Sequence, residues 1–266
     1  MSAYLEHFGL SGHPFSKEID DSDLWLPPSK KGIVDELVEA VEEHSSACLI
    51  GDPGVGKTSV LRALRQRLPQ AGFRLTYCHN VTLGRRDFYR QLCHAVGITA
   101  AADSGSVFRA VTAYVEDHSR ERVHPVFLLD EAQLLQQAML EHLHVLLNYE
   151  WDRRAWLSII LVGLPELEDR LQMRRNRSLY SRLHCRVRID GHCSDDTADY
   201  IHHRLRKNGV KGEIFTSDAI AMLHEAAFGS LRDIDRIATA ALKAASRKRR
   251  KLVERDIIER LVEVAD

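Results

Sequence analysis

The sequence predicts an α/β fold with a five-stranded parallel sheet, followed by a smaller, all-helical domain. Short apolar segments alternate with helical stretches over the first 190 residues, and such alternation is typical of parallel sheets. After "CRVRID" the apolar spacing is helical to the end of the chain. We therefore predict an α/β domain over residues 1–190 and a helical domain over residues 191–266. A chain of 266 residues, 44% of them hydrophobic, is long and apolar enough for both cores.

Each predicted strand is a short apolar run next to a helical stretch. Glycines at 209, 212 and 229 separate the predicted helices of the second domain. The strands are predicted at 47–50, 73–78, 125–130, 157–163 and 185–189, and the C-terminal helices start near Ser194, Ser217, Leu231 and Arg255.

Composition excludes several classes of protein. The N-terminus lacks the basic and apolar regions of a signal peptide, and no apolar run approaches the roughly 18 residues that span a bilayer. Five widely spaced cysteines without a C-x-x-C pair favour free thiols in a reducing cytoplasm. Cys185 and Cys193 each follow a histidine, but at no common zinc spacing, so we interpret these residues as structural.

Charge is distributed unevenly along a chain whose net charge is only −1. Residues 1–46 carry ten acidic and three basic residues, which gives −7 there and leaves +6 on the remainder. Any surface that binds nucleic acid must therefore be local.

The segment "LIGDPGVGKTSV" contains the phosphate-binding pattern G-x-x-x-x-G-K-T, known as Walker A. Glycines let backbone N–H groups curl around a phosphate, and a helix that starts there directs its dipole at the anion. Lys57 is expected to reach the β- and γ-phosphates, and the Thr58 hydroxyl to bind magnesium. The predicted nucleotide-binding residues are Asp52, Pro53, Gly54, Val55, Gly56, Lys57, Thr58 and Ser59.

The segment "VFLLDEAQ" ends a buried strand on two carboxylates, Asp130 and Glu131. An ionised carboxylate at such a place needs a partner, and a magnesium ion beside the phosphate loop supplies one for Asp130. Glu131 is then expected to polarise the water that attacks the γ-phosphate. The alternative is that Glu131 only caps the helix that follows.

With these motifs in place, the chain resembles AAA+ ATPases over nearly its whole length, and in particular the branch with the secretion ATPase ExeA and the transposition regulators TnsC, TniB and MuB. The opening "YLEHFGLSGHPF" is similar to that of ExeA-like ATPases, where such residues lie beside the adenine. The resemblance therefore implies that Phe8, Pro14 and Phe15 bind the adenine side of the nucleotide. The alternative is an apolar arm that packs on the core.

Two further segments resemble AAA+ motifs at the γ-phosphate. "LSIILVGLPEL" resembles the fourth strand, which carries a polar sensor side chain in many relatives but ends here in Gly163. "YSRL", within a stretch with six arginines from Arg174 to Arg188, resembles the arginine-finger box. The resemblance implies that Arg182 reaches the γ-phosphate of a neighbouring subunit, where an always protonated guanidinium stabilises developing charge.

In the helical domain, "GSLRDIDR" resembles the sensor 2 motif, with Leu231 in place of proline and Asp235 in place of asparagine. Arg232 keeps the position that touches the γ-phosphate. Contact with that phosphate would make the lid respond differently to ATP and ADP. The alternative is a surface ion pair with Asp233 or Asp235.

Two basic segments are candidates for binding the phosphates of DNA. Arg85, Arg86 and Arg90 follow the second strand, in a region that lines the DNA channel of related transposition ATPases. "SRKRRK" supplies Arg247, Lys248, Arg249, Arg250 and Lys251, more positive charge than a helix C-terminus needs for its dipole.

The resemblance implies a cytoplasmic bacterial ATPase that assembles on double-stranded DNA with ATP and Mg²⁺, recruits or activates a transposase, and disassembles on hydrolysis. A homo-oligomer is expected, as a ring or a helical filament with six subunits per turn, together with a transposase and a target-selecting protein as partners and without a membrane. Two alternatives remain: an ExeA-like secretion ATPase and a helicase loader.

Overall fold

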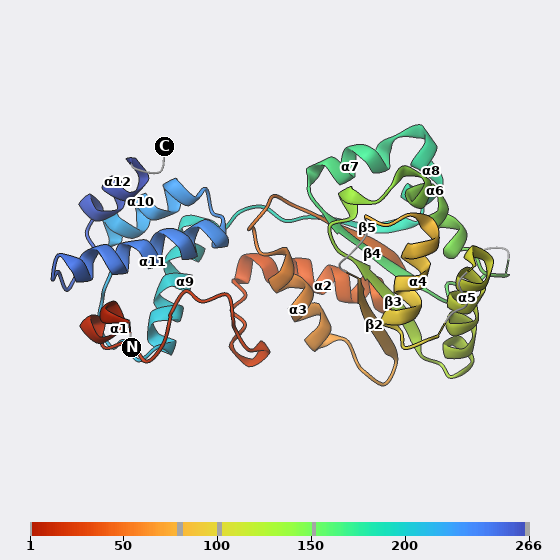
Figure 1. The fold of residues 1–266 in the computed structure, drawn as a ribbon, viewed down its shortest axis with the longest axis horizontal. Coiled ribbons are helices and arrows are strands. Elements are labelled where there is room, and N and C mark those ends of the chain that lie inside the picture. Colours follow the sequence, from red (N-terminus) through yellow and green to blue (C-terminus); the bar gives the residue numbers. More distant parts are fainter. Residues whose placement is uncertain (1, 79–81, 100–102, 151–152, 264–266) are drawn as a thin grey trace. The chain divides into compact units, whose positions relative to one another are not determined.

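The computed structural model describes residues 2–78, 82–99, 103–150 and 153–263 (Figure 1). The chain divides into two compact units. The α/β unit comprises Gly32–Asp52 and Val60–Ile189, and the helical unit comprises the residues up to Lys31, Pro53–Ser59 and the residues from Asp190 onwards. The phosphate loop and the N-terminal arm thus belong to the same unit as the C-terminal helices.

The α/β unit is built on a parallel sheet of five strands in the order β2-β3-β4-β1-β5. This confirms the predicted fold class, and each strand begins and ends within two residues of its prediction. The strands are β1 (Ser46–Ile50), β2 (Phe73–Cys78), β3 (His124–Leu129), β4 (Ser158–Gly163) and β5 (Leu183–Arg188). β1, β3 and β4 are fully buried, as expected for inner strands covered on both faces.

Helices cover both faces of the sheet. The chain moves from β1 to β2 in one direction across the sheet and afterwards in the other, so right-handed crossovers place α3 on the face opposite α4–α8 (Figure 1). Ile50, Phe127 and Leu161 pack with apolar residues of α4–α8 in one core. The helices are α2 (Pro28–Glu42), α3 (Lys57–Arg67), α4 (Arg85–Ala95), α5 (Ser104–Arg120), α6 (Gln137–Leu146), α7 (Pro165–Gln172) and α8 (Arg177–Tyr180), with 3-10 turns η2 (Ala132–Leu134) and η4 (Arg174–Asn176).

The helical unit has its own core, formed by four C-terminal helices and the N-terminal arm. The four helices begin where the sequence predicts, and Ser230 caps α11 by accepting from the Asp233 N–H. The apolar stripe of α11, which includes Ile234, Ile237 and Leu242, is buried. The elements are α1 (Ala3–Phe8), η1 (Asp21–Asp23), α9 (Ser194–Lys207), α10 (Ser217–Ala227), α11 (Leu231–Arg247) and α12 (Arg255–Glu263).

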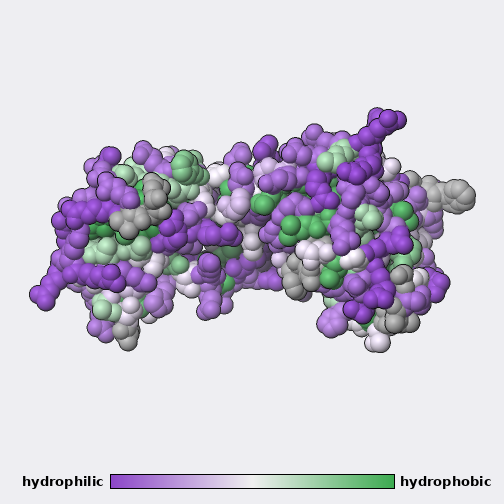
Figure 2. Space-filling view, turned by 45° about the horizontal axis from the view of Figure 1, so that its top comes forward, coloured by the Kyte–Doolittle hydropathy of each residue, from purple (hydrophilic) through white to green (hydrophobic). Residues whose placement is uncertain are grey.

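The surface is mostly hydrophilic on the face that Figure 2 shows, with small apolar patches on both units. Among the residues that the structure describes, no helix combines the length and the apolar character needed to cross a membrane.

Candidate functional site

The predicted phosphate loop is a glycine turn that connects β1 to α3. Gly54 and Gly56 have φ angles of +82° and +102°, which residues with side chains rarely adopt. α3 begins at Lys57, so the N–H groups of its first turn have no acceptor within the helix. A turn of this shape, followed by a helix N-terminus, presents N–H groups to a phosphate.

Within the helical unit, the start of α11 packs directly on this loop. The Leu231 backbone N–H donates to the Gly54 carbonyl at 2.9 Å. A Cβ atom on Gly54 would collide with the Ser230 hydroxyl and lie 3.2 Å from the Cβ of Arg232. The glycine is therefore required by close approach as well as by its φ angle. The structure brings Arg232 to the loop, and it adds Ser230, which the sequence analysis did not single out.

A buried histidine that the sequence analysis missed also contacts the loop. His192 is 4% exposed, and a Cβ on Gly56 would lie 3.5 Å from its Cε1 atom. Burial, followed by the nearby Lys30 ammonium, lowers the pKa of His192. Lys30 in turn donates to the Asp190 carbonyl at 2.6 Å, and Trp25 stacks on the His192 ring. The loop therefore has a fixed and mostly neutral side chain beside it at pH 7.

In the α/β unit, Asp130 and Glu131 lie at the same edge of the sheet as the start of the phosphate loop. Gly51 follows β1, and its N–H donates to the Gly163 carbonyl at the end of β4, which separates β1 from β3. The Asp130 carboxylate accepts from the Tyr77 hydroxyl at 2.7 Å and from the Glu131 N–H at 2.9 Å. Burial, with the hydrogen bond to Asp130, raises the pKa of Tyr77.

Glu131 adopts a strained backbone conformation at this edge. Its φ angle of +54° lies in the left-handed region, which costs a residue with a side chain about 1 kcal/mol or more. It occupies the N-cap of η2 but makes no side-chain capping hydrogen bond. The structure therefore gives no support to the capping alternative.

A second missed residue, Gln133, holds the Glu131 side chain. Its Nε2 donates to Glu131 Oε2 at 2.7 Å, and its Oε1 accepts from the Leu164 N–H at 3.2 Å. In the sequence Gln133 is only the last letter of "VFLLDEAQ", with no spacing rule to mark it.

Arg232 is exposed and forms no ion pair with either neighbouring aspartate within the described residues. Asp233 pairs with Arg236 at 3.2 Å. Asp235 accepts from the Tyr200 hydroxyl at 2.6 Å, and burial raises the pKa of this carboxyl group to about 6. The alternative of a surface ion pair is thus not realised, and the predicted role at the γ-phosphate stays open to Arg232.

Arg182 lies at the opposite edge of the sheet from Gly51. It directly precedes β5, whose first residue pairs with Ser46 at the start of β1. The five residues of β1 separate the two edges by about 15 Å. Arg182 lines a cavity of about 340 Å³ with His44, Arg154 and other residues, and it donates to the Ser178 carbonyl at 3.1 Å. Its own chain's phosphate loop begins at the far end of the strand.

The N-terminal arm packs in the core of the helical unit. Phe15 is 7% exposed, and its ring lies 6.4 Å from the rings of Tyr200 and Phe215. Pro14 is buried and Phe8 is half-buried. This packing agrees with the alternative of an apolar arm on the core, and the adenine-side role of Phe8, Pro14 and Phe15 stays a prediction.

The three arginines predicted to bind DNA on α4 differ in their partners. Arg86 and Arg90 both pair with Asp87, at 3.2 and 3.3 Å. Arg85 forms no ion pair within the described residues and lines a cavity of about 210 Å³ with Tyr89, His142 and other residues.

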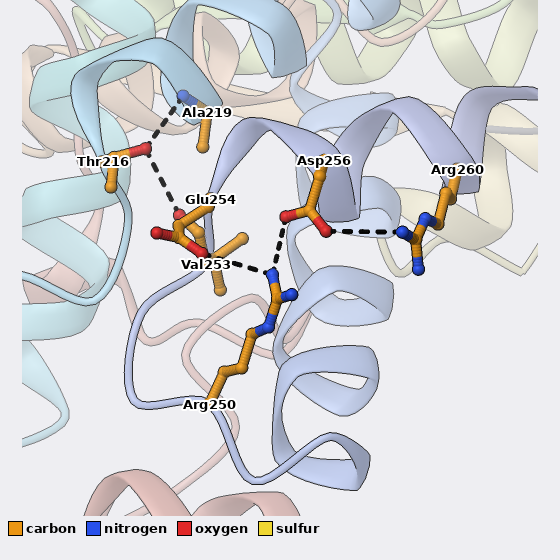
Figure 3. A network of polar contacts seen from close by, with 7 residues as sticks. All are labelled: Thr216, Ala219, Arg250, Val253, Glu254, Asp256 and Arg260. Atoms are coloured by element: carbon orange, nitrogen blue, oxygen red, sulfur yellow. Dashed lines mark hydrogen bonds and ion pairs between the residues drawn. The ribbon is translucent and has the colours of Figure 1, made fainter.

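The basic residues at the end of α11 and just after it also differ in their partners. Arg250 pairs with Glu254 and Asp256 (Figure 3). The Lys251 ammonium donates to the His7 carbonyl at 2.7 Å. The other three basic residues are exposed, and the described part of the chain gives none of them an ion pair or side-chain hydrogen bond: Arg247, Lys248 and Arg249. Only these three remain available for another molecule.

The donor groups fit a nucleotide and magnesium. A glycine turn with positive φ angles at the start of a helix is suited to a polyphosphate. The Thr58 hydroxyl and the Asp130 carboxylate are hard oxygen donors of the kind that magnesium takes beside phosphate oxygens. Glu131 keeps one carboxylate oxygen, Oε1, without a hydrogen bond from the described residues.

A comparison with protein families matches the central part of the chain. Residues 40–171 match the family model described as an AAA domain. This part of the chain is therefore similar to AAA domains. The match covers β1, the phosphate loop, β3 with its two carboxylates, and β4.

One curated relative matches almost the whole chain. General secretion pathway protein A of Aeromonas hydrophila is 31% identical over 260 residues, which cover 96% of this chain and 47% of the relative. The chain therefore spans about half the length of this relative.

Solved structures of other proteins share the fold. The Aeropyrum pernix ORC1 protein in complex with DNA superposes with a TM-score of 0.65 at 18% identity, over 90% of this chain and 66% of that one. The Thermotoga maritima RuvB Holliday junction branch migration motor gives 0.60 at 15% identity, over 95% and 73%. At these identities the likeness shows the fold alone.

Proposed function

We propose that this protein is an ATP-hydrolysing molecular switch whose complete site forms between two copies of the chain. The observation that carries the proposal is the placement of charges on the sheet. Asp130, Glu131 and the start of the phosphate loop lie at the carboxyl edge, whereas Arg182 lies at the amino edge. One chain cannot bring Arg182 to its own nucleotide across about 15 Å.

Each residue of the carboxyl edge has a separate task in hydrolysis. The loop N–H groups and Lys57 bind the β- and γ-phosphates, and Thr58 and Asp130 hold magnesium, which would neutralise developing charge on the phosphate oxygens. Glu131 accepts a proton from the attacking water. The water oxygen then bonds to the γ-phosphorus, and the bond between that phosphorus and the β–γ bridging oxygen breaks. The products are ADP and phosphate.

The helical unit supplies the response to the nucleotide. The start of α11 contacts the loop at Gly54 through Ser230, Leu231 and Arg232. A change of charge at the γ-phosphate would therefore alter the contacts at the start of α11. A contact made with ATP and lost with ADP gives the two nucleotides different affinities for the two conformations.

For the process that the switch drives, we propose ATP-dependent assembly on double-stranded DNA that recruits or activates a transposase. Exposed Arg85, Arg247, Lys248 and Arg249 support it, because they keep their charge available for phosphates. The DNA in the ORC1 complex belongs to that protein, and it supports the proposal only as a precedent for this fold.

Salt-dependent DNA binding tests this proposal. Fluorescence anisotropy with a labelled duplex should show tighter binding with a non-hydrolysable ATP analogue than with ADP, and a log–log salt slope of about −0.9 per phosphate contacted. Neutralising Arg247, Lys248 and Arg249 together should lower that slope. Neutralising Arg250 and Lys251, which have partners within the chain, is the matched control and should change the slope less. Equal, weak binding with both nucleotides would contradict the DNA switch.

A second candidate function is a secretion ATPase. The match to general secretion pathway protein A over 96% of this chain favours it. The same ATP switch would then drive assembly of a secretion apparatus and would not depend on DNA. ATPase activity that is unchanged by duplex DNA, together with absent DNA binding in the anisotropy series, would favour this candidate.

A further inference from the structure

Gln133 makes two hydrogen bonds with opposite ends of one amide group. Its Nε2 donates to Glu131 Oε2 at 2.7 Å, and its Oε1 accepts from the Leu164 N–H at 3.2 Å. A carboxylate can only accept and a backbone N–H can only donate, so the orientation of the amide is fixed by its partners. Gln133 thereby connects Glu131, two residues after the end of β3, to Leu164, the residue after β4.

The space for this amide exists because β4 ends in glycine. A Cβ on Gly163 would lie 2.8 Å from Gln133 Oε1 and 2.8 Å from Leu167 Cδ2. Gly163 brings no side chain to this edge of the sheet, and the Gln133 amide lies in the place that a side chain would occupy.

The turn that carries Gln133 is fixed by a half-buried arginine. Arg170 on α7 donates to the Gln133 carbonyl and, at 2.7 Å, to the Leu135 carbonyl. Both ends of Gln133 are thus held, its backbone by α7 and its amide oxygen by the residue after β4.

Glu131 by itself lacks such support. It is exposed, in a left-handed conformation, and its side chain receives no other hydrogen bond from the described residues. A carboxylate that must accept a proton from water needs one orientation, and misplacement by 1 Å can cost about 100-fold in rate.

We propose that Gln133 is a positioning residue that orients the Glu131 carboxylate for hydrolysis. Its amide binds Oε2 and leaves Oε1 to accept the proton of the attacking water. The inference rests on the proposed ATPase function and adds to it a residue that touches neither phosphate nor magnesium. Because the Gln133 amide also accepts from the Leu164 N–H, the position of the residue after β4 influences the orientation of Glu131 through Gln133.

Steady-state ATP hydrolysis by Gln133→Met tests the inference, because methionine keeps the length of the side chain and removes both hydrogen bonds. We expect kcat to fall about 10- to 100-fold while KM for ATP stays within about twofold. Gln136→Met is the matched control. Gln136 is a glutamine three positions further on whose amide donates to the Thr82 carbonyl, so its substitution should leave kcat unchanged.

A double mutant separates positioning from a merely structural role. Glu131→Asp shortens the side chain and places its carboxylate beyond the reach of Gln133. The double mutant Glu131→Asp with Gln133→Met should therefore have a kcat within about twofold of that of Glu131→Asp alone. A structural role would instead lower kcat by the same factor in both backgrounds. Gln133→Asn, whose amide cannot span both partners, should show the same loss of kcat as Gln133→Met, and it replaces that variant if the latter does not fold.

The outcomes distinguish the inference from the function on which it rests. If the wild-type chain hydrolyses ATP and Gln133→Met or Gln133→Asn does so at the same kcat, the inference is overturned and the function stands. If KM rises by as much as kcat falls, or if the double mutant is additive, Gln133 is not a positioning residue. If the assembled wild-type chain hydrolyses no ATP, the proposed function fails first.

Discussion

The two edges of the sheet carry opposite chemistry. At the carboxyl edge, hydrogen bonds join Tyr77, Asp130, Glu131 and Gln133 in one line that ends on the Leu164 N–H. At the amino edge, the His44 and His124 rings stack 4.0 Å apart, and arginines line the cavities around them. The carboxyl edge is acidic and held in place by its own contacts. The amino edge carries arginines at its cavities, although Glu43 lines one of them and Glu150 pairs with Arg154. We call the two the acidic edge and the basic edge.

The difference bears on the proposed assembly of copies of the chain. Arg122, Arg154 and Arg182 line two cavities at the amino edge, of about 430 and 340 Å³. In that proposal, opposite charge on opposite edges would favour head-to-tail association, which gives rings or helical filaments according to whether the rotation closes. A parallel sheet supports this arrangement because all its strands end at the same edge.

The largest effect should come from the basic edge. In the proposed shared site, Arg182 stabilises charge on a neighbour's phosphate, so we expect Arg182→Ala to lower kcat about 1,000-fold. Mixing it with Lys57→Ala subunits should recover part of the activity, since one variant provides the loop and the other the arginine. ATPase assays over a concentration series check both. Activity that is independent of concentration and shows no rescue would contradict the shared site.

Substitutions at the acidic edge should separate the binding of ATP from its hydrolysis. Glu131→Gln should keep affinity for ATP and lower turnover about 100-fold or more, because the amide cannot accept a proton. Lys57→Ala should instead abolish nucleotide binding. Fluorescent ATP binding and phosphate release, measured on the same samples, separate the two effects. Wild-type turnover by Glu131→Gln would show that another group activates the water.

His124 should make the amino edge sensitive to acid. Burial, with the His44 ring as the second cause, lowers the pKa of His124 from 6.5 to about 3. The unfolded chain takes up this proton near pH 6.5 and the folded chain does not. The contribution of His124 to stability is therefore complete above pH 6.5 and is lost as the pH falls toward 3. At pH 5 the loss amounts to roughly 2 kcal/mol.

Urea unfolding at pH 7.5 and pH 5 measures that loss. His124→Gln cannot be protonated and retains an amide for the Ser158 hydroxyl, which His124 contacts at 2.8 Å. The variant should lose about 2 kcal/mol less than the wild type between the two pH values. An equal loss of stability in the wild type and in His124→Gln would show that a group other than His124 causes the sensitivity to acid.

The smallest effect should come from Tyr77→Phe, at the outer end of the acidic line. Loss of the hydroxyl leaves Asp130 with one hydrogen bond fewer, worth about 1 kcal/mol, so half-saturating magnesium should rise about fivefold. Magnesium titration of ATPase activity gives the value. Tyr180→Phe, whose ring lies under the Arg186 guanidinium, is the control and should not change it. An unchanged magnesium requirement in Tyr77→Phe would show that the Tyr77 hydroxyl does not help Asp130 to bind magnesium.

Local patterns in the sequence were sufficient for the elements and for the phosphate loop. Strand positions follow from apolar runs, and the starts of α9–α12 follow from capping and helical spacing, because both depend on neighbouring residues. The turn at Gly54 and Gly56 follows for the same reason, since its glycines meet a backbone requirement within a few residues.

Contacts between residues that are far apart in the sequence depend on the tertiary structure. Gln133, Tyr77 and His192 carry no local signal, because each acquires its contact from a strand or loop far along the chain. The same applies to the basic residues: the sequence treats Arg247 and Arg250 alike, but folding gives only Arg250 an acidic partner. Neighbouring residues were enough to predict the α/β elements, the phosphate loop and the two carboxylates. The orientation of Glu131 and the separation of Arg182 from its own nucleotide depend on strand order, which no single segment of the sequence specifies.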